Sequence, residues 1–170
     1  TQLVFDAGNW ATPQTATVTG ADDDVADGDI LYTITTTVGS TDPAYANAPA
    51  ADVSVTNLDD DTAGVVVNPT SGLTTTEAGG TAVFTVVLTS EPTAVVTVTL
   101  GSSNPGEGTV SPTQLVFNAG NWATPQTVTV TGVDDDVADG DSPYTITTTV
   151  GSTDPGYANA PATDVSVTNL

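Results

Sequence analysis

The feature that most constrains this sequence is an internal repeat with an offset of 113 − 1 = 112 residues. Residues 1–58 align without a gap to residues 113–170, and only seven of the 58 positions differ. The stretch "TQLVFDAGNWATPQTATVTG" at Thr1, for example, returns as "TQLVFNAGNWATPQTVTVTG" at Thr113. A fixed period marks an array of repeats, and a period this long is a whole domain rather than one rung of a solenoid.

Apolar and polar residues alternate within each period. The stretch "TAVFTVVL" places Phe84, Val86 and Leu88 on one face of an extended segment. Short runs of this kind, separated by Gly, Pro, Asn and Asp, are typical of an all-β fold, an antiparallel β-sandwich. No segment has helical periodicity. The alternation predicts strands at residues 65–76, 82–88, 95–100, 114–117, 127–131, 144–150 and 165–170.

The repeat predicts how these strands divide into domains. Residues 1–58 match the last four predicted strands, so we expect them to form the C-terminal half of a first sandwich. Residues 59–64 are then an acidic linker, and residues 65–170 are a complete second sandwich. Strand exchange between subunits could complete the half domain, but the chain holds two copies of the last four strands and one copy of the first three. We therefore expect the chain to be part of a longer array of tandem repeats.

The charge is entirely one-sided. The chain has 21 acidic residues and no Lys, Arg or His, which gives a formal charge of −21. Such a chain is not expected to bind nucleic acid, whose phosphates need basic residues. There is no cysteine for disulfides or metal thiolates, and no apolar run approaches the roughly 20 residues needed for membrane insertion. Without His, Cys or Lys there is no ordinary nucleophile–base pair, so we do not expect an enzyme.

Following the predicted strands up and down the sandwich places every dense acidic segment at the same end of a domain. Two carboxylates about 4 Å apart repel by roughly 1 kcal/mol in water and about 4 kcal/mol at a partly buried site. Because the chain has no basic residue, it cannot neutralise these carboxylates from within, whereas a hard divalent cation can. The candidate ligands are Asp22, Asp23, Asp24, Asp27, Asp29, Asp59, Asp60 and Asp61 in the first domain, and Glu77, Asp134, Asp135, Asp136, Asp139 and Asp141 in the second.

Calcium suits these ligands best. Ca²⁺ accepts six to eight oxygen ligands in flexible geometry, whereas Mg²⁺ needs a stricter octahedron and keeps its waters. Zinc and copper usually take His or Cys, which this chain lacks. The spacing does not fit an EF-hand, because aligning Gly28 to the loop glycine puts Val25 and Ile34 at ligand positions. The ligands are therefore expected to come from several loops.

The stretches "TEAGGTAVFTVVLTSEP" and "TVTVTGVDDDVADGD", followed by a strand and a "DDD" linker, resemble a Calx-beta domain. The whole period is similar to the Calx-beta-like and Ig-like tandem repeats of giant bacterial adhesins and cell-surface proteins. The resemblance implies an extracellular domain with Ca²⁺ ligands at Glu77, Asp134, Asp135, Asp136, Asp22, Asp23, Asp24, Asp59, Asp60 and Asp61. The longer third-to-fourth strand segment of that family is replaced here by "GSSNPGEGTVSP", so the resemblance does not extend to Glu107.

Two functions stay open. The leading one is a calcium-stiffened structural repeat of an extracellular adhesin stalk or surface filament, whose partners are adjacent repeats and other copies in a filament. The alternative is a carbohydrate-binding module, in which Trp10, Trp122, Tyr45 and Tyr157 stack on a glycan, although such aromatic residues more often cap the core beside a turn. The acidic clusters also have a simpler interpretation as a solvated surface, with Asp139 and Asp141 only shaping a turn.

Overall fold

A computed structural model of the chain describes residues 1–134 and 140–170, so Asp135, Asp136 and Asp139 lie outside the described residues. The chain divides into two compact units. The first contains residues 1–23 and 29–58, and the second contains residues 24–28 and 59–170. Among the residues that the structure describes, none forms a helix with the length and apolarity needed to cross a bilayer.

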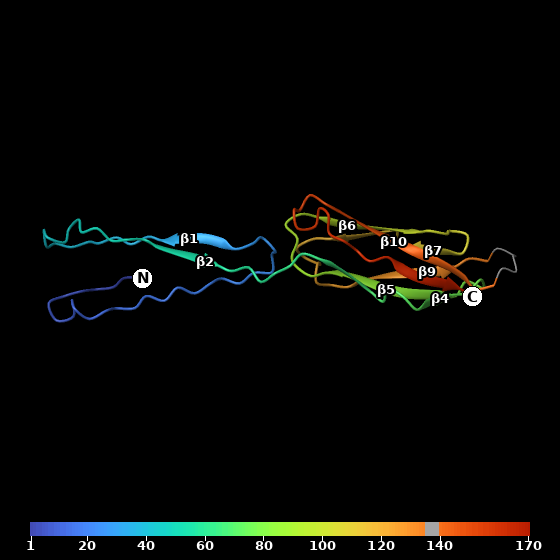
Figure 1. The fold of residues 1–170 in the computed structure, drawn as a ribbon, viewed down its shortest axis with the longest axis horizontal. Helices are drawn as coiled ribbons and strands as arrows, with labels where there is room; N and C mark the ends of the chain where they lie inside the picture. Colours follow the sequence, from blue (N-terminus) through green and yellow to red (C-terminus); the bar gives the residue numbers. More distant parts are fainter. Residues whose placement is uncertain (135–139) are drawn as a thin grey trace. The chain divides into compact units, whose positions relative to one another are not determined.

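The second unit is a sandwich of two sheets (Figure 1). The five-stranded sheet has the order β4-β11-β10-β6-β8 and the four-stranded sheet has the order β3-β5-β9-β7. All neighbouring strands are antiparallel except the parallel pair of β4 and β11. The predicted all-β sandwich is therefore confirmed. The strands are β3 (Val65–Asn68), β4 (Leu73–Thr75), β5 (Thr81–Leu88), β6 (Val96–Ser102), β7 (Gly108–Ser111), β8 (Gln114–Phe117), β9 (Gln126–Gly132), β10 (Ser142–Ser152) and β11 (Val165–Asn169).

The core of the second unit lies between these two sheets. Phe84 and Val86 of β5 are buried from the four-stranded sheet, and Val98 of β6 and Ile146 of β10 are buried from the five-stranded sheet. Each fully buried side chain of this size stabilises the fold by about 1.5–3 kcal/mol relative to exposure. The alternation that predicted the strands therefore also identified the residues of the core.

Two strand predictions differ from the structure. The predicted strand 65–76 is two strands, β3 and β4, which belong to different sheets. The chain changes sheets between them at Pro69, which has no amide to donate to a ladder, and at Gly72, whose φ is 76°. β7 lies in a segment for which the sequence predicted a loop. Its four residues pair with β9, and Gly108 is needed there because a Cβ atom would meet the ring of Tyr144.

The first unit contains β1 (Ile30–Ile34) and β2 (Val53–Asn57), which form an antiparallel pair. Its register repeats that of β10 and β11: Tyr32 pairs with Val55 as Tyr144 pairs with Val167. The segments that align with β8 and β9 form no strand within the described residues of this unit. In the second unit β8 pairs with β6, and β9 pairs with β5 and β7. Nothing in residues 1–58 corresponds to those three partner strands.

Candidate metal centre

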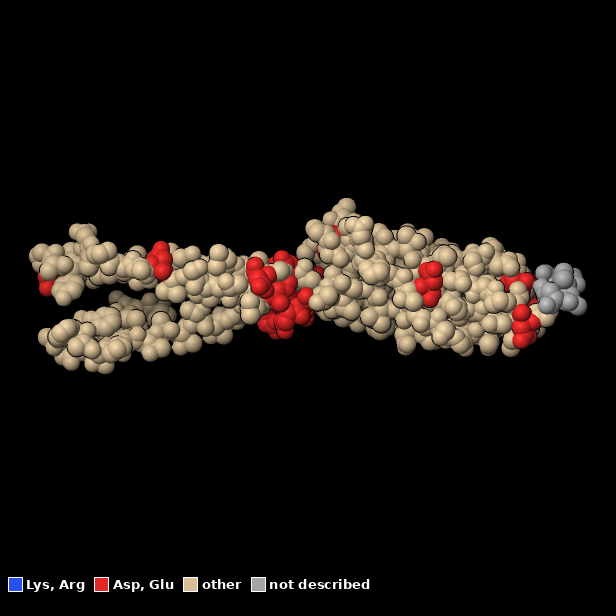
Figure 2. Space-filling view, in the orientation of Figure 1, with Lys and Arg blue, Asp and Glu red and all other residues tan. Residues whose placement is uncertain are grey.

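Three acidic turns meet at one end of the second unit. Glu77 lies in the turn between β4 and β5, Glu107 lies between β6 and β7, and Asp134 follows β9. The Val133 amide donates to the Glu107 carbonyl (3.0 Å), and the Glu77 amide donates to the Leu170 carbonyl (3.3 Å). In Figure 2 acidic side chains lie at this end of the unit. The arrangement brings together segments that are far apart in the sequence.

A buried hydrogen-bond network lies directly beneath these turns. The hydroxyl of Thr75 donates to Asn169 Oδ1 (2.9 Å) and lies 3.0 Å from the hydroxyl of Tyr144. Asn169 Nδ2 donates to Glu107 Oε2 (3.3 Å) and to the Val133 carbonyl (3.2 Å). Thr75 and Asn169 are each 1% exposed and Glu107 is 6% exposed. The network thus joins the two sheets and holds the carboxylate of Glu107 in a largely dry position.

The electrostatics of the network keep Tyr144 protonated. Burial raises the pKa of the Tyr144 hydroxyl, and the negative charge of Glu107 raises it further. The hydrogen bond with Thr75 acts in the opposite direction but does not cancel these two effects. A protonated Tyr144 can donate a hydrogen bond at neutral pH, which a phenolate beside a buried carboxylate could not do.

The donor atoms at this end fit a hard cation, because they are carboxylate and carbonyl oxygens without nitrogen or sulfur ligands. Among residues 1–134 and 140–170, however, no group of three or more acidic side chains is arranged to hold a metal ion. Three predicted ligands, Asp135, Asp136 and Asp139, lie outside the described residues. Glu77, Asp134 and Asp141 therefore stay predicted ligands, and the described part of this end does not make a complete site by itself.

The linker and part of the first acidic loop are grouped with the second unit. The Gly28 amide donates to Asp59 Oδ2 (2.5 Å), and the Asp61 amide donates to Asp59 Oδ1 (2.9 Å). The Glu91 amide, in the turn between β5 and β6, donates to the carbonyl of Asp24 (2.6 Å). These contacts lie at the end of the sandwich opposite to Glu77. The grouping assigns Asp24, Asp27, Asp59, Asp60 and Asp61 to the second unit, and Asp22, Asp23 and Asp29 to the first.

The aromatic residues differ between the two units. Tyr157 is 1% exposed, and its hydroxyl donates to the Ser90 carbonyl (2.7 Å) and accepts from the Ser90 amide (3.2 Å). Trp122 is partly buried against the core. Tyr45 and Trp10 of the first unit are 60% and 74% exposed. Tyr157 therefore has no free face for a sugar, and Trp122 has the core-capping role that such residues usually have.

Asp154, which was not predicted from the sequence, organises the opposite end of the second unit. It is 6% exposed, and its Oδ2 accepts hydrogen bonds from the Thr93 amide (2.6 Å) and the Thr93 hydroxyl (2.9 Å). Its Oδ1 accepts from the Gly156 amide (2.8 Å). Burial acts to raise the pKa of this carboxyl, but the hydrogen bonds outweigh burial and hold the pKa below its ordinary value of 3.8. The only signal in the sequence was the turn-forming "STDP".

We expect Asp154→Asn to lower the free energy of unfolding by about 2 kcal/mol at pH 7, the range for hydrogen bonds to a charged group. Because the folded pKa lies below the unfolded one, this contribution is present above pH 4 and is lost as the pH falls below 3.8. Urea unfolding at pH 7 and pH 3 measures both values. Asp42→Asn is the matched control, since Asp42 aligns with Asp154 but has no counterpart of Thr93 in its unit. Equal losses at both pH values would contradict the prediction.

No family model matches the sequence, and no curated protein matches it. Solved structures do match it. The apo-form Calx CBD1 domain is 19% identical, with a TM-score of 0.50 over 65% of this chain and 97% of that chain. Domains 4 and 5 of the S-layer protein SbsC are 19% identical, with a TM-score of 0.40 over 85% of this chain and 78% of that chain. WR4, a C. elegans MSP family member, is 13% identical, with a TM-score of 0.43 over 62% of this chain and 95% of that chain.

Likeness at these identities concerns the fold alone, and only the Calx CBD1 domain among these three reaches a TM-score of 0.50. The match covers nearly the whole of that domain and about two thirds of this chain, which is the proportion that the second unit represents. The second unit therefore has an Ig-like β-sandwich fold of the kind seen in Calx-beta domains.

Proposed function

We propose that this chain is a structural repeat of an extracellular surface protein and that its acidic turns bind Ca²⁺, which stiffens the array. One observation carries the proposal: Glu107 holds a nearly buried carboxylate beside the acidic turns of Glu77 and Asp134, in a chain without a single basic residue. A buried charge is costly unless it is paired or coordinates a metal. The described partner of Glu107 is the neutral amide of Asn169, which leaves the negative charge uncompensated.

A calcium ion at this end would supply the missing positive charge. Glu77, Glu107 and Asp134 would hold it together with the aspartates of the loop between β9 and β10, and backbone carbonyls would complete the oxygen shell. Any ion that binds only the folded state stabilises that state, by about 2.7 kcal/mol at a hundredfold excess over the dissociation constant. The role is structural, and we propose no catalytic activity for the chain.

Stiffening along the array would use the linker aspartates. The linker Asp59–Asp61 and the loop Asp24–Gly28 belong to one compact unit and share the hydrogen bond from Gly28 to Asp59. In the sequence, however, that loop belongs to the preceding repeat. A cation held by both segments would fix the linker to this loop and oppose their mutual repulsion. Neighbouring repeats are then the partners that matter, as in an adhesin stalk or a surface filament.

Calcium binding is tested by calorimetric titration of the dialysed 170-residue chain. We expect binding with a dissociation constant near 10⁻⁴–10⁻³ M, the range of extracellular modules, and a melting temperature that rises with Ca²⁺. Glu107→Gln and Asp134→Asn should weaken binding. The control is Asp42→Asn, in the first unit and outside both acidic segments, which should bind like the unmodified chain. If the unmodified chain gives no binding heat and melts at the same temperature in Ca²⁺ and in chelator, the proposal is wrong.

A further inference from the structure

Apolar side chains that the second unit buries are exposed in the first unit. The two units have almost the same sequence over these segments, so each residue can be compared with its counterpart 112 positions later. In the first unit the exposed fractions are 40% for Leu3, 53% for Phe5, 44% for Val18, 37% for Ile34 and 53% for Val53. The counterparts Leu115, Phe117, Val130, Ile146 and Val165 are 3%, 0%, 0%, 0% and 0% exposed.

The local structure of the first unit is nevertheless that of its counterpart. The side-chain amide of Gln14 donates to the Val4 carbonyl (2.6 Å), and Gln126 makes the same bond to Val116 (2.8 Å). The register of β1 and β2 also repeats that of β10 and β11. The first unit therefore has the local hydrogen bonds of the second, but the strands that cover its apolar face are missing from residues 1–58.

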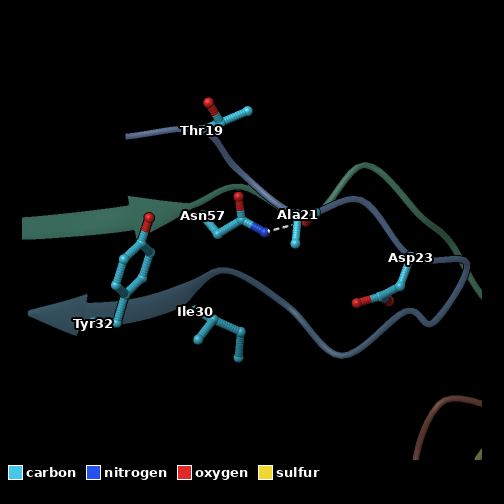
Figure 3. Close-up of a pocket in the computed structure, with 6 residues that line it drawn as sticks. All are labelled: Thr19, Ala21, Asp23, Ile30, Tyr32 and Asn57. Carbon is cyan, nitrogen blue, oxygen red and sulfur yellow. Dashed lines mark hydrogen bonds between the residues drawn. The ribbon is translucent and has the colours of Figure 1, made fainter. Parts of the chain in front are cut away.

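An open pocket marks where polar groups of those strands would enter (Figure 3). It has a volume of about 430 Å³, and Tyr32 and Asn57 line it together with Thr19, Ala21, Asp23 and Ile30. Asn57 donates to the Ala21 carbonyl (2.6 Å), just as Asn169 donates to the Val133 carbonyl (3.2 Å). In the second unit Thr75 contacts the counterparts of both Tyr32 and Asn57, and Glu107 contacts the counterpart of Asn57. The first unit has no residue that corresponds to Thr75 or Glu107.

We propose that the apolar face of the first unit is a docking surface for another copy of segment 59–112, and that the two fold together when this copy is joined ahead of Thr1. The occupant is identified by the second unit, where residues 65–111 cover the same residues as β3 to β7. The junction is in register, because Pro112 is followed by Thr113, the counterpart of Thr1. Once docked, a threonine hydroxyl would reach Tyr32 and Asn57, and a glutamate carboxylate would reach Asn57.

Another copy of the 170-residue chain fits this surface less well. Its own segment 65–111 already covers residues 113–170 of the same chain. Moving that segment to a neighbour would expose one apolar face in order to cover another, so the number of exposed faces would not fall. The proposal rests on the structural role of the repeat and does not depend on calcium, which allows the two to be tested separately.

The test adds a copy of residues 59–112 ahead of Thr1 of the full chain and measures hydrogen exchange by mass spectrometry in the presence of chelator. Peptides from β1 and β10 are distinguishable, because Ile30 and Leu31 replace Ser142 and Pro143. We expect exchange of the β1 and β2 amides to slow by at least about 100-fold, since amides in a packed sheet exchange only through larger openings. Their rates should approach those of β10 and β11 in the same molecule.

The control carries Phe84→Asp and Val86→Asp in the added copy alone and should leave β1 and β2 as fast as in the 170-residue chain. Protection of β10 and β11 verifies in each sample that the second unit is folded. The proposal is overturned if the added wild-type copy leaves exchange of β1 and β2 unchanged. It is also overturned if the 170-residue chain alone sediments as a dimer with β1 and β2 already protected, because a second copy would then be the occupant.

Discussion

Phe117→Ala is expected to lower the free energy of unfolding of the second unit by about 3–5 kcal/mol, the cost of truncating a large core residue. Phe117 is 0% exposed at the end of β8 and belongs to the core between the two sheets. Its removal would leave a cavity that the surrounding strands can close only in part. Denaturant unfolding followed by the tryptophan and tyrosine signals measures the loss.

Phe5→Ala is the matched control, because Phe5 occupies the same position of the repeat and is 53% exposed. Both substitutions delete the same side chain from nearly the same local sequence. The difference between the two losses of unfolding free energy therefore measures the effect of the covering strands alone. We expect Phe5→Ala to change the unfolding free energy of the second unit by less than about 0.5 kcal/mol. Equal losses for the two variants would contradict the asymmetry between the two units.

Asn169→Leu is expected to cost about 3 kcal/mol or more, through the polar network rather than through packing. Leucine cannot donate to the carboxylate of Glu107 or accept from the hydroxyl of Thr75, and both groups are buried. Leaving a buried polar group unsatisfied costs about 1–3 kcal/mol, and a charged group costs more. Thermal unfolding of the variant at neutral pH measures the loss.

Asn57→Leu tests the same substitution where the network is incomplete. Asn57 keeps the bond to the Ala21 carbonyl, but its unit has no counterpart of Thr75 or Glu107. The second unit should then unfold as in the unmodified chain. If Asn169→Leu were as stable as the unmodified chain at neutral pH, the network would not be what holds Glu107 in place.

The fold could be predicted largely because alternation is a local signal. Phe84, Val86 and Leu88 are two residues apart, and the strand that they define is correct. The change of sheets between β3 and β4 was missed because "VVVN" and "LTT" are both typical of extended chain. The sheet to which each strand belongs depends on its distant pairing partners, which a local pattern does not reveal. The short β7 was missed because only Val110 marks it as a strand, in a stretch dominated by turn-forming residues.

The candidate site could be predicted to the level of loops. Strand direction alone placed the turns of Glu77 and Asp134 at one end, since antiparallel strands return to the same side. The network beneath them could not be found in this way, because Thr75 and Asn169 are 94 positions apart and neither belongs to a recognisable motif. Asp154 was missed for the same reason, since its main partner Thr93 is 61 positions away.

We propose that calcium stiffens an array of these repeats, and small-angle scattering of a chain with several repeats measures this stiffening. Without the ion, the carboxylates of the linker repel one another and the linker should bend, so we predict that excess chelator shortens the maximum dimension. Replacing Asp59, Asp60 and Asp61 by Asn should make the bending of that linker independent of calcium. The control Asp42→Asn should leave the effect of calcium on the maximum dimension unchanged. Scattering profiles that are identical with Ca²⁺ and with excess chelator would contradict stiffening by calcium, even if calorimetry showed that the ion binds.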